Sequence, residues 1–162
     1  MKILRVFLLI LLVFCVFQSK AQHKTVNLIN INQLEKRITN PDTVFIVNFW
    51  ATWCGPCVKE LPVFNQLQKT YAKQPLKVLL VSMDFKSKLK SQVIPFVNKN
   101  NFFAEVFLAD NSNEQEFIDR IDKNWSGALP GTLIINTKKK IHQFYEQEFT
   151  YTELNKIYQK SK

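Results

Sequence analysis

The stretch that decides how this chain folds is Val44-Phe45-Ile46-Val47-Asn48-Phe49-Trp50, followed after two residues by Trp53-Cys54-Gly55-Pro56-Cys57. The first part is an almost continuous apolar run, which is typical of a strand buried on both faces of a sheet. Residues 58–73 then have the spacing of apolar side chains that predicts a helix. The two cysteines are therefore expected at a strand-to-helix junction.

A junction of this kind suits thiol chemistry. The first helical turn offers unpaired N–H groups and the positive end of the helix dipole, which stabilise a thiolate. Cys54 is expected to be the more exposed sulfur, and Cys57 lies about one turn along, within reach of a mixed disulfide on Cys54. Pro56 suits a first turn, and Gly55 lets a partner chain come close.

Two other uses of the cysteine pair are less well supported by the sequence. Half of a zinc site is disfavoured because a structural site needs four ligands, and Cys15, His23 and His142 do not have ligand-like spacing. A purely structural disulfide is disfavoured because so short a loop removes little entropy from the unfolded chain. A redox-active pair is the stronger interpretation.

The motif from Phe49 to Cys57 resembles the active-site stretch of thioredoxin-fold proteins, and Glu60-Leu61-Pro62 after it is similar to the TlpA/ResA branch. Those relatives are extracytoplasmic bacterial thiol:disulfide oxidoreductases. The resemblance covers roughly residues 25–160. It implies an α/β, thioredoxin-like fold, with a central mixed β-sheet flanked by helices and a TlpA-type strand-helix insertion.

The resemblance also implies roles for single residues. Asn48 stands where thioredoxin has a buried aspartate, and it cannot titrate. Glu60, three residues after Cys57, is implied to set thiol reactivity, although a solvated surface glutamate is the plain alternative.

A second landmark is Leu129-Pro130, where the family holds a cis proline facing the cysteines; an ordinary trans turn is the alternative. The backbone of Leu129 would pair with an incoming extended chain. Trp53, Gly55, Pro56, Leu129 and Pro130 are thus the expected substrate-binding groove.

The rest of the chain supplies the remaining elements. Helices are predicted at 32–39, 91–101, 113–122 and 150–160, with Asn30 and Thr150 or Thr152 as N-caps. Strands are predicted at 76–85, 102–108, 129–135 and 141–149. The strand at 102–108 and the helix at 113–122 correspond to the insertion. The strand–helix–strand order around the cysteines predicts parallel pairing.

Residues 1–21 have the pattern of a secretory signal peptide. Lys2 and Arg5 precede an apolar run of 12 residues, and Ser19 and Ala21 are small residues at a cleavage site. We expect a cleaved signal and one domain at 22–162, in the periplasm or another extracytoplasmic compartment. An uncleaved membrane anchor is the alternative.

The chain has a formal net charge of +9. Its lysines are spread along the sequence without a nucleic-acid motif, so a basic solvated surface is preferred to nucleic-acid binding. Lys86, Lys88 and Lys90 form a basic cluster, which either steers an acidic partner or is simply a solvated segment.

These observations predict a monomeric protein-disulfide reductase that uses Cys54 and Cys57, tuned by Glu60, and needs no metal or organic cofactor. Its partners would be proteins with disulfides or thiols and a membrane thiol donor. Two alternatives remain: a thioredoxin-fold copper- or metal-binding assembly module, and a partner-binding domain that keeps a structural disulfide.

Overall fold

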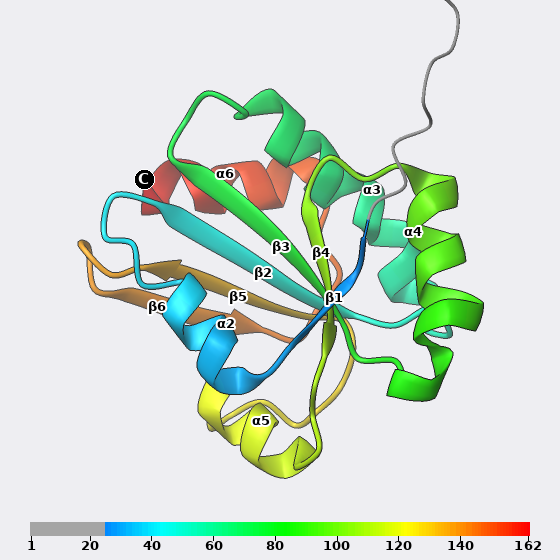
Figure 1. Ribbon diagram of the computed structural model, residues 1–162. Coiled ribbons are helices and arrows are strands. Elements are labelled where there is room, and N and C mark those ends of the chain that lie inside the picture. Colours follow the sequence, from blue (N-terminus) through cyan, green and yellow to red (C-terminus); the bar gives the residue numbers. More distant parts are fainter. Residues whose placement is uncertain (1–24) are drawn as a thin grey trace, which may run out of the picture.

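The computed structural model describes residues 25–162, and within them six strands form one sheet in the order β1-β4-β3-β2-β5-β6 (Figure 1). The strands are β1 (Asn27–Ile29), β2 (Val44–Trp50), β3 (Leu76–Ser82), β4 (Glu105–Ala109), β5 (Gly131–Asn136) and β6 (Ile141–Tyr145). The first four in this order are parallel, and β5 and β6 are antiparallel to their neighbours. The predicted mixed sheet of an α/β, thioredoxin-like fold is thus confirmed.

Helices cover both faces of the sheet (Figure 1). They are α2 (Ile31–Arg37), α3 (Gly55–Thr70), α4 (Ile94–Asn100), α5 (Glu114–Ile121) and α6 (Tyr151–Ser161). One apolar cluster joins α3, α4 and α6 to the sheet, and another joins α2 and α5 to its opposite face. Because β2 lies between the two clusters, all seven of its residues are buried, which explains the continuous apolar run.

Local sequence signals fix several helix ends. Asn30 caps α2 in a capping box with Gln33, and Thr150 caps α6 in a capping box with Glu153. Asn113 caps α5, accepting a hydrogen bond from the backbone N–H of Glu116. These caps lie where the sequence places helix starts, because they depend only on residues three positions apart.

Some boundaries differ from the prediction. The strand expected from residue 102 begins at Glu105, since Phe102 and Ala104 pack into the core ahead of it. The helix expected over 91–101 is a π-helical turn, Leu89–Val93, followed directly by α4, and Pro95 lies in the first turn of α4. The strand β6 ends at Tyr145 instead of residue 149, and β1 was not predicted.

The N-terminal predictions lie outside the described residues, including the signal peptide at 1–21. Across residues 25–162, no helix combines the length and the apolar character that a bilayer crossing requires.

Candidate active site

Cys54 and Cys57 form a disulfide at the start of α3 (S–S 2.02 Å). Cys54 is the N-cap of this helix, and its sulfur accepts a hydrogen bond from the backbone N–H of Cys57 at 3.3 Å. Cys54 is 6% exposed and Cys57 is fully buried, which confirms the expected order of exposure. Of the two cysteines, only Cys54 therefore reaches the protein surface.

The carboxyl ends of the parallel strands bring the disulfide to one edge of the sheet. Trp50, the last residue of β2, is in register with Ser82, the last residue of β3, and Ser82 in turn with Leu108 of β4. The backbone N–H of Met83 donates to the carbonyl of Trp50 at 2.7 Å. The loop that carries the cysteines is therefore held against the segment that follows β3.

Asp84 fastens these two segments together. Its carboxylate accepts hydrogen bonds from the backbone N–H and the hydroxyl of Thr52, at 2.9 and 2.6 Å, and from the hydroxyl of Ser82 at 2.7 Å. The side chain is almost fully buried. Sequence reasoning missed this residue, although an aspartate just beyond a buried parallel strand is a signal that could have indicated it.

Glu60 is buried rather than solvated, with 3% of its surface exposed. One carboxylate oxygen accepts from the side-chain amide of Asn48 and the other from the backbone N–H of Phe149, both at 2.8 Å. Because residues three apart share one face of a helix, Glu60 lies on the same buried face of α3 as Cys57. The alternative of a surface glutamate is therefore wrong.

Burial raises the pKa of Glu60 from 4.5 to about 7. The hydrogen bonds from Phe149 and Asn48 act against this rise, and the negative charge of Glu148 adds to it. A carboxyl group with this pKa exchanges its proton near neutral pH, as proton transfer to and from a thiol requires.

Asn48 connects Glu60 to the next strand. Its amide nitrogen also donates to the hydroxyl of Thr132 at 3.1 Å, and these two residues are in register between β2 and β5. Within the described part of the chain, its buried Oδ1 has no hydrogen-bond partner. If the side-chain amide of Asn48 is flipped so that Oδ1 faces Glu60, a protonated Glu60 can donate a hydrogen bond to that oxygen. An ionised carboxylate has no proton to donate.

Leu129 and Pro130 lie on the same edge as the cysteines. Gly131, which opens β5, is in register with Phe49 near the end of β2. The Leu129–Pro130 peptide bond is cis, as the resemblance implies. Pro130 is buried and Leu129 is half-buried.

The other predicted groove residues directly precede and follow Cys54 in the chain. Trp53 is 67% exposed, and Gly55 and Pro56 are exposed as well. A Cβ atom on Gly55 would meet nothing within 4 Å, so the approach to the disulfide is open on this side.

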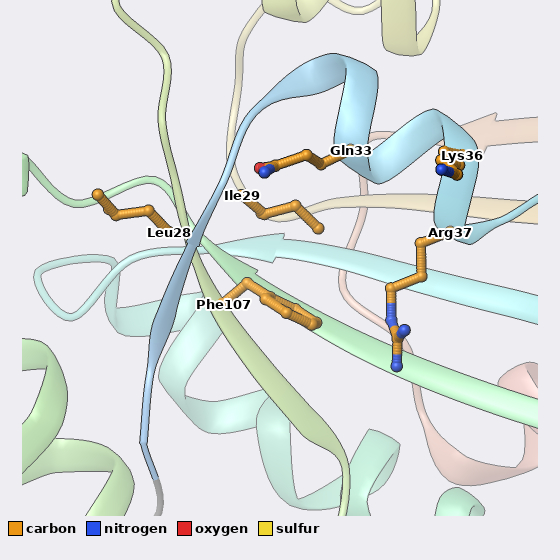
Figure 2. A pocket seen from close by; sticks show the side chains of 6 residues that line it. All are labelled: Leu28, Ile29, Gln33, Lys36, Arg37 and Phe107. Atoms are coloured by element: carbon orange, nitrogen blue, oxygen red, sulfur yellow. The ribbon is translucent and has the colours of Figure 1, made fainter.

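No cluster of three or more histidine, cysteine, aspartate or glutamate side chains within residues 25–162 could hold a metal ion. His142 lies on β6, half exposed, with its Nε2 3.3 Å from Asp122. A separate pocket of about 530 Å³ lies between α2, β1 and β4 (Figure 2). Its lining includes Arg37 and Phe107 but none of the predicted site residues.

Known proteins resemble this chain in both sequence and fold. The model of the AhpC/TSA family matches residues 17–144. The thioredoxin-like protein YneN of Bacillus subtilis is 47% identical over 115 residues, which cover 67% of this chain and 59% of that protein. The thiol-disulfide oxidoreductase ResA of Geobacillus kaustophilus is 26% identical over 110 residues, covering 68% of this chain and 58% of that protein. The chain thus spans a little over half the length of these curated relatives.

Among solved structures, a thioredoxin-related protein from Neisseria meningitidis serogroup B superposes with a TM-score of 0.65 at 24% identity, covering 76% of this chain and 87% of that one. A thiol:disulfide interchange protein from Chlorobium tepidum superposes with a TM-score of 0.62 at 21% identity, covering 75% and 81%. These two likenesses establish the fold. The family model covers most of the chain and shows that the chain belongs to the AhpC/TSA family. Its sequence relatives make it similar, within that family, to the thioredoxin-like proteins of the TlpA/ResA type.

Proposed function

We propose that this protein is an extracytoplasmic thiol:disulfide oxidoreductase that reduces disulfides in other proteins through Cys54 and Cys57. The observation that carries the proposal is the disulfide at the N-terminus of α3, with Cys54 at the surface end and Cys57 buried behind it. The names of the relatives ResA and YneN support it.

The first step begins with both cysteines reduced. The thiolate of Cys54 attacks one sulfur of the partner's disulfide, so a bond forms between Cys54 and the partner while the partner's S–S bond breaks. The sulfur that leaves takes up a proton. The N–H of Cys57, which points at the sulfur of Cys54, stabilises the attacking thiolate.

The second step releases the partner. Cys57 loses its proton and attacks the sulfur of Cys54, which forms the internal disulfide and expels the partner's second thiol. Two electrons have then passed to the partner. A dithiol donor returns the pair to the reduced state by the reverse exchange, and a membrane thiol protein is the donor we propose. No metal or organic cofactor takes part.

Glu60 would hold the proton that Cys57 gives up and takes back. Its pKa of about 7 is suited to this exchange at neutral pH. The hydrogen bonds from Asn48 and from the backbone of Phe149 hold the carboxyl group in place on the face of α3 that carries Cys57.

Trp53, Gly55, Pro56, Leu129 and Pro130 would form the groove in which the partner lies. The exposed indole of Trp53 offers apolar contact beside the sulfur. The backbone of Leu129, ahead of the cis proline, would pair with an extended partner segment in the manner of an added strand.

The extracytoplasmic location rests on the signal-peptide pattern at residues 1–21. One structural neighbour, at 13% identity and a TM-score of 0.56, is described as a secreted disulfide oxidoreductase of Mycobacterium tuberculosis. We expect mature protein from the native host to have an intact mass that corresponds to a chain beginning at Gln22. A mass that includes residue 1 would instead support a retained anchor.

The test of activity is the reduction of insulin with dithiothreitol as the electron source. Cys54→Ser should abolish the acceleration. Cys57→Ser, reduced and then separated from dithiothreitol, should accumulate a mixed disulfide with insulin. If the wild type reduces insulin no faster than Cys54→Ser does, the proposal is contradicted and a domain with a structural disulfide is favoured.

The direction of electron flow is tested by the equilibrium potential of the pair in a glutathione or dithiothreitol series. A reductant should have a potential of about −270 mV, whereas a value of about −120 mV would make the protein a disulfide donor.

A further inference from the structure

Phe85 is the most exposed large apolar side chain in the described part of the chain, at 76%, and Trp53 follows at 67%. Two such aromatic side chains in water forgo the stabilisation that their burial would give. Trp53 already belongs to the proposed groove. Phe85 has no part in the fold's core or in the chemistry of the cysteines, so its exposure calls for another use.

The Asp84 hydrogen bonds bring the two aromatic residues to neighbouring places on the backbone. Thr52 is bound to Asp84 through both its N–H and its hydroxyl. Trp53 directly follows Thr52, and Phe85 directly follows Asp84. Because these hydrogen bonds are largely buried and Ser82 adds another, the two segments are held together beside Cys54.

A basic border continues from Phe85. Lys86, the next residue, forms an ion pair with Asp110. Lys88 and Lys90 are exposed, and among residues 25–162 neither has an acidic group within 4.0 Å. The nearby carboxylate of Asp84 is buried and hydrogen-bonded, so this border has a surplus of positive charge.

We propose that Trp53, Phe85, Lys88 and Lys90 form a docking surface, the aromatic–lysine surface, for disulfide-bearing segments of acidic proteins. The matching segment has a large apolar side chain beside its reactive cysteine and carboxylates a few residues further on. This inference rests on the proposed function, since the docked segment is the one whose disulfide Cys54 attacks. Complementary charge raises the encounter rate, and the aromatic contact sets which segments react.

The experiment measures second-order rates of the reduced protein with peptides that each hold one cysteine as a mixed disulfide with thionitrobenzoate. The first peptide has phenylalanine next to the cysteine and two glutamates beyond it. The second replaces the glutamates by lysines, and the third replaces the phenylalanine by glycine. Hydroxyethyl disulfide, which is small and uncharged, is the reference substrate.

We expect the first peptide to react about threefold to tenfold faster than either of the others at low ionic strength, with the charge preference shrinking as salt is added. Phe85→Ala should remove the preference for phenylalanine, whereas Phe103→Ala, another exposed aromatic, should keep it. The pair Lys88→Glu and Lys90→Glu should reverse the charge preference. The pair Lys156→Glu and Lys160→Glu on α6 changes the net charge equally and should leave the preference intact.

The reference substrate separates the two proposals. Failure to react with hydroxyethyl disulfide and with all three peptides would overturn the proposed function itself. Normal reduction of it with equal rates for the three peptides would overturn the docking surface alone. Binding to vesicles of anionic lipid that is lost in Lys88→Glu with Lys90→Glu, without any peptide preference, would assign the surface to a membrane and would also overturn the inference.

Discussion

Replacing Glu60 by glutamine should change how the stability of the oxidised protein depends on pH. The carboxyl group is buried, and its pKa is raised from 4.5 to about 7 in the folded protein. The unfolded chain exposes it to water, where its pKa returns to the ordinary range. In the disulfide form the cysteines do not titrate. The pH dependence of the difference in stability between wild type and Glu60→Gln therefore reports the titration of Glu60.

The sign follows from proton binding. Between about pH 4.5 and 7 the folded protein holds a proton on Glu60 that the unfolded chain releases, so the free energy of unfolding falls as the pH rises. A shift of this size corresponds to about 3 kcal/mol. The wild type should therefore lose about 3 kcal/mol relative to Glu60→Gln between pH 4.5 and 7, and nothing further above that range.

The assay is urea unfolding at half-unit steps of pH, followed by the fluorescence of the buried Trp50 and Trp125. Glu114→Gln, an exposed glutamate on α5, is the matched control and should follow the wild type throughout. A constant difference between wild type and Glu60→Gln across this range would refute the reasoning. So would a change centred below about pH 5, because it would mean that Glu60 has the pKa of a solvated carboxyl group.

Three further substitutions test the packing and the loop connections by urea unfolding. Asp84→Asn should lower the free energy of unfolding by about 1–3 kcal/mol, because it weakens the charge-assisted hydrogen bonds from Thr52 and Ser82. An unchanged urea midpoint would show that Asp84 does not stabilise the loop that carries the cysteines. Leu34→Ala, at a fully buried position of α2, should lower the free energy of unfolding by about 2–5 kcal/mol through the cavity it leaves. A smaller loss would show that neighbouring side chains move to fill the cavity. Thr150→Ala should cost about 1 kcal/mol by removing the cap of α6, whereas Thr152→Ala, which caps nothing, should cost less.

Much of the fold could be predicted because the signals are local. The buried strand, the cysteines at a helix start and the caps at Asn30 and Thr150 depend on residues within a few positions of one another. The parallel pairing of β2 and β3 follows from the helix between them. The cis bond before Pro130 was implied only by the resemblance, since no local pattern distinguishes the isomers.

The strand β1 shows where local signals end. It has only three residues, two of them exposed, and it exists because it pairs in parallel with β4, whose paired residues come eighty positions later. Its sequence mixes helical and strand-like spacing, so the edge of β4 decided its conformation. The start of β4 at Glu105 is explained in the same way, because its partner β3 fixes the register.

By itself, the sequence determined the site's chemical groups: two sulfurs three positions apart at a helix start, a glutamate one turn later, and a proline ahead of a late strand. Only the tertiary structure decided their environment. It buried Glu60 against the backbone of Phe149, 89 positions away, and joined Asp84 to Thr52 across 32 positions. A pKa depends on the water excluded and the donors within about 3 Å, and both are set by how helices pack on the sheet.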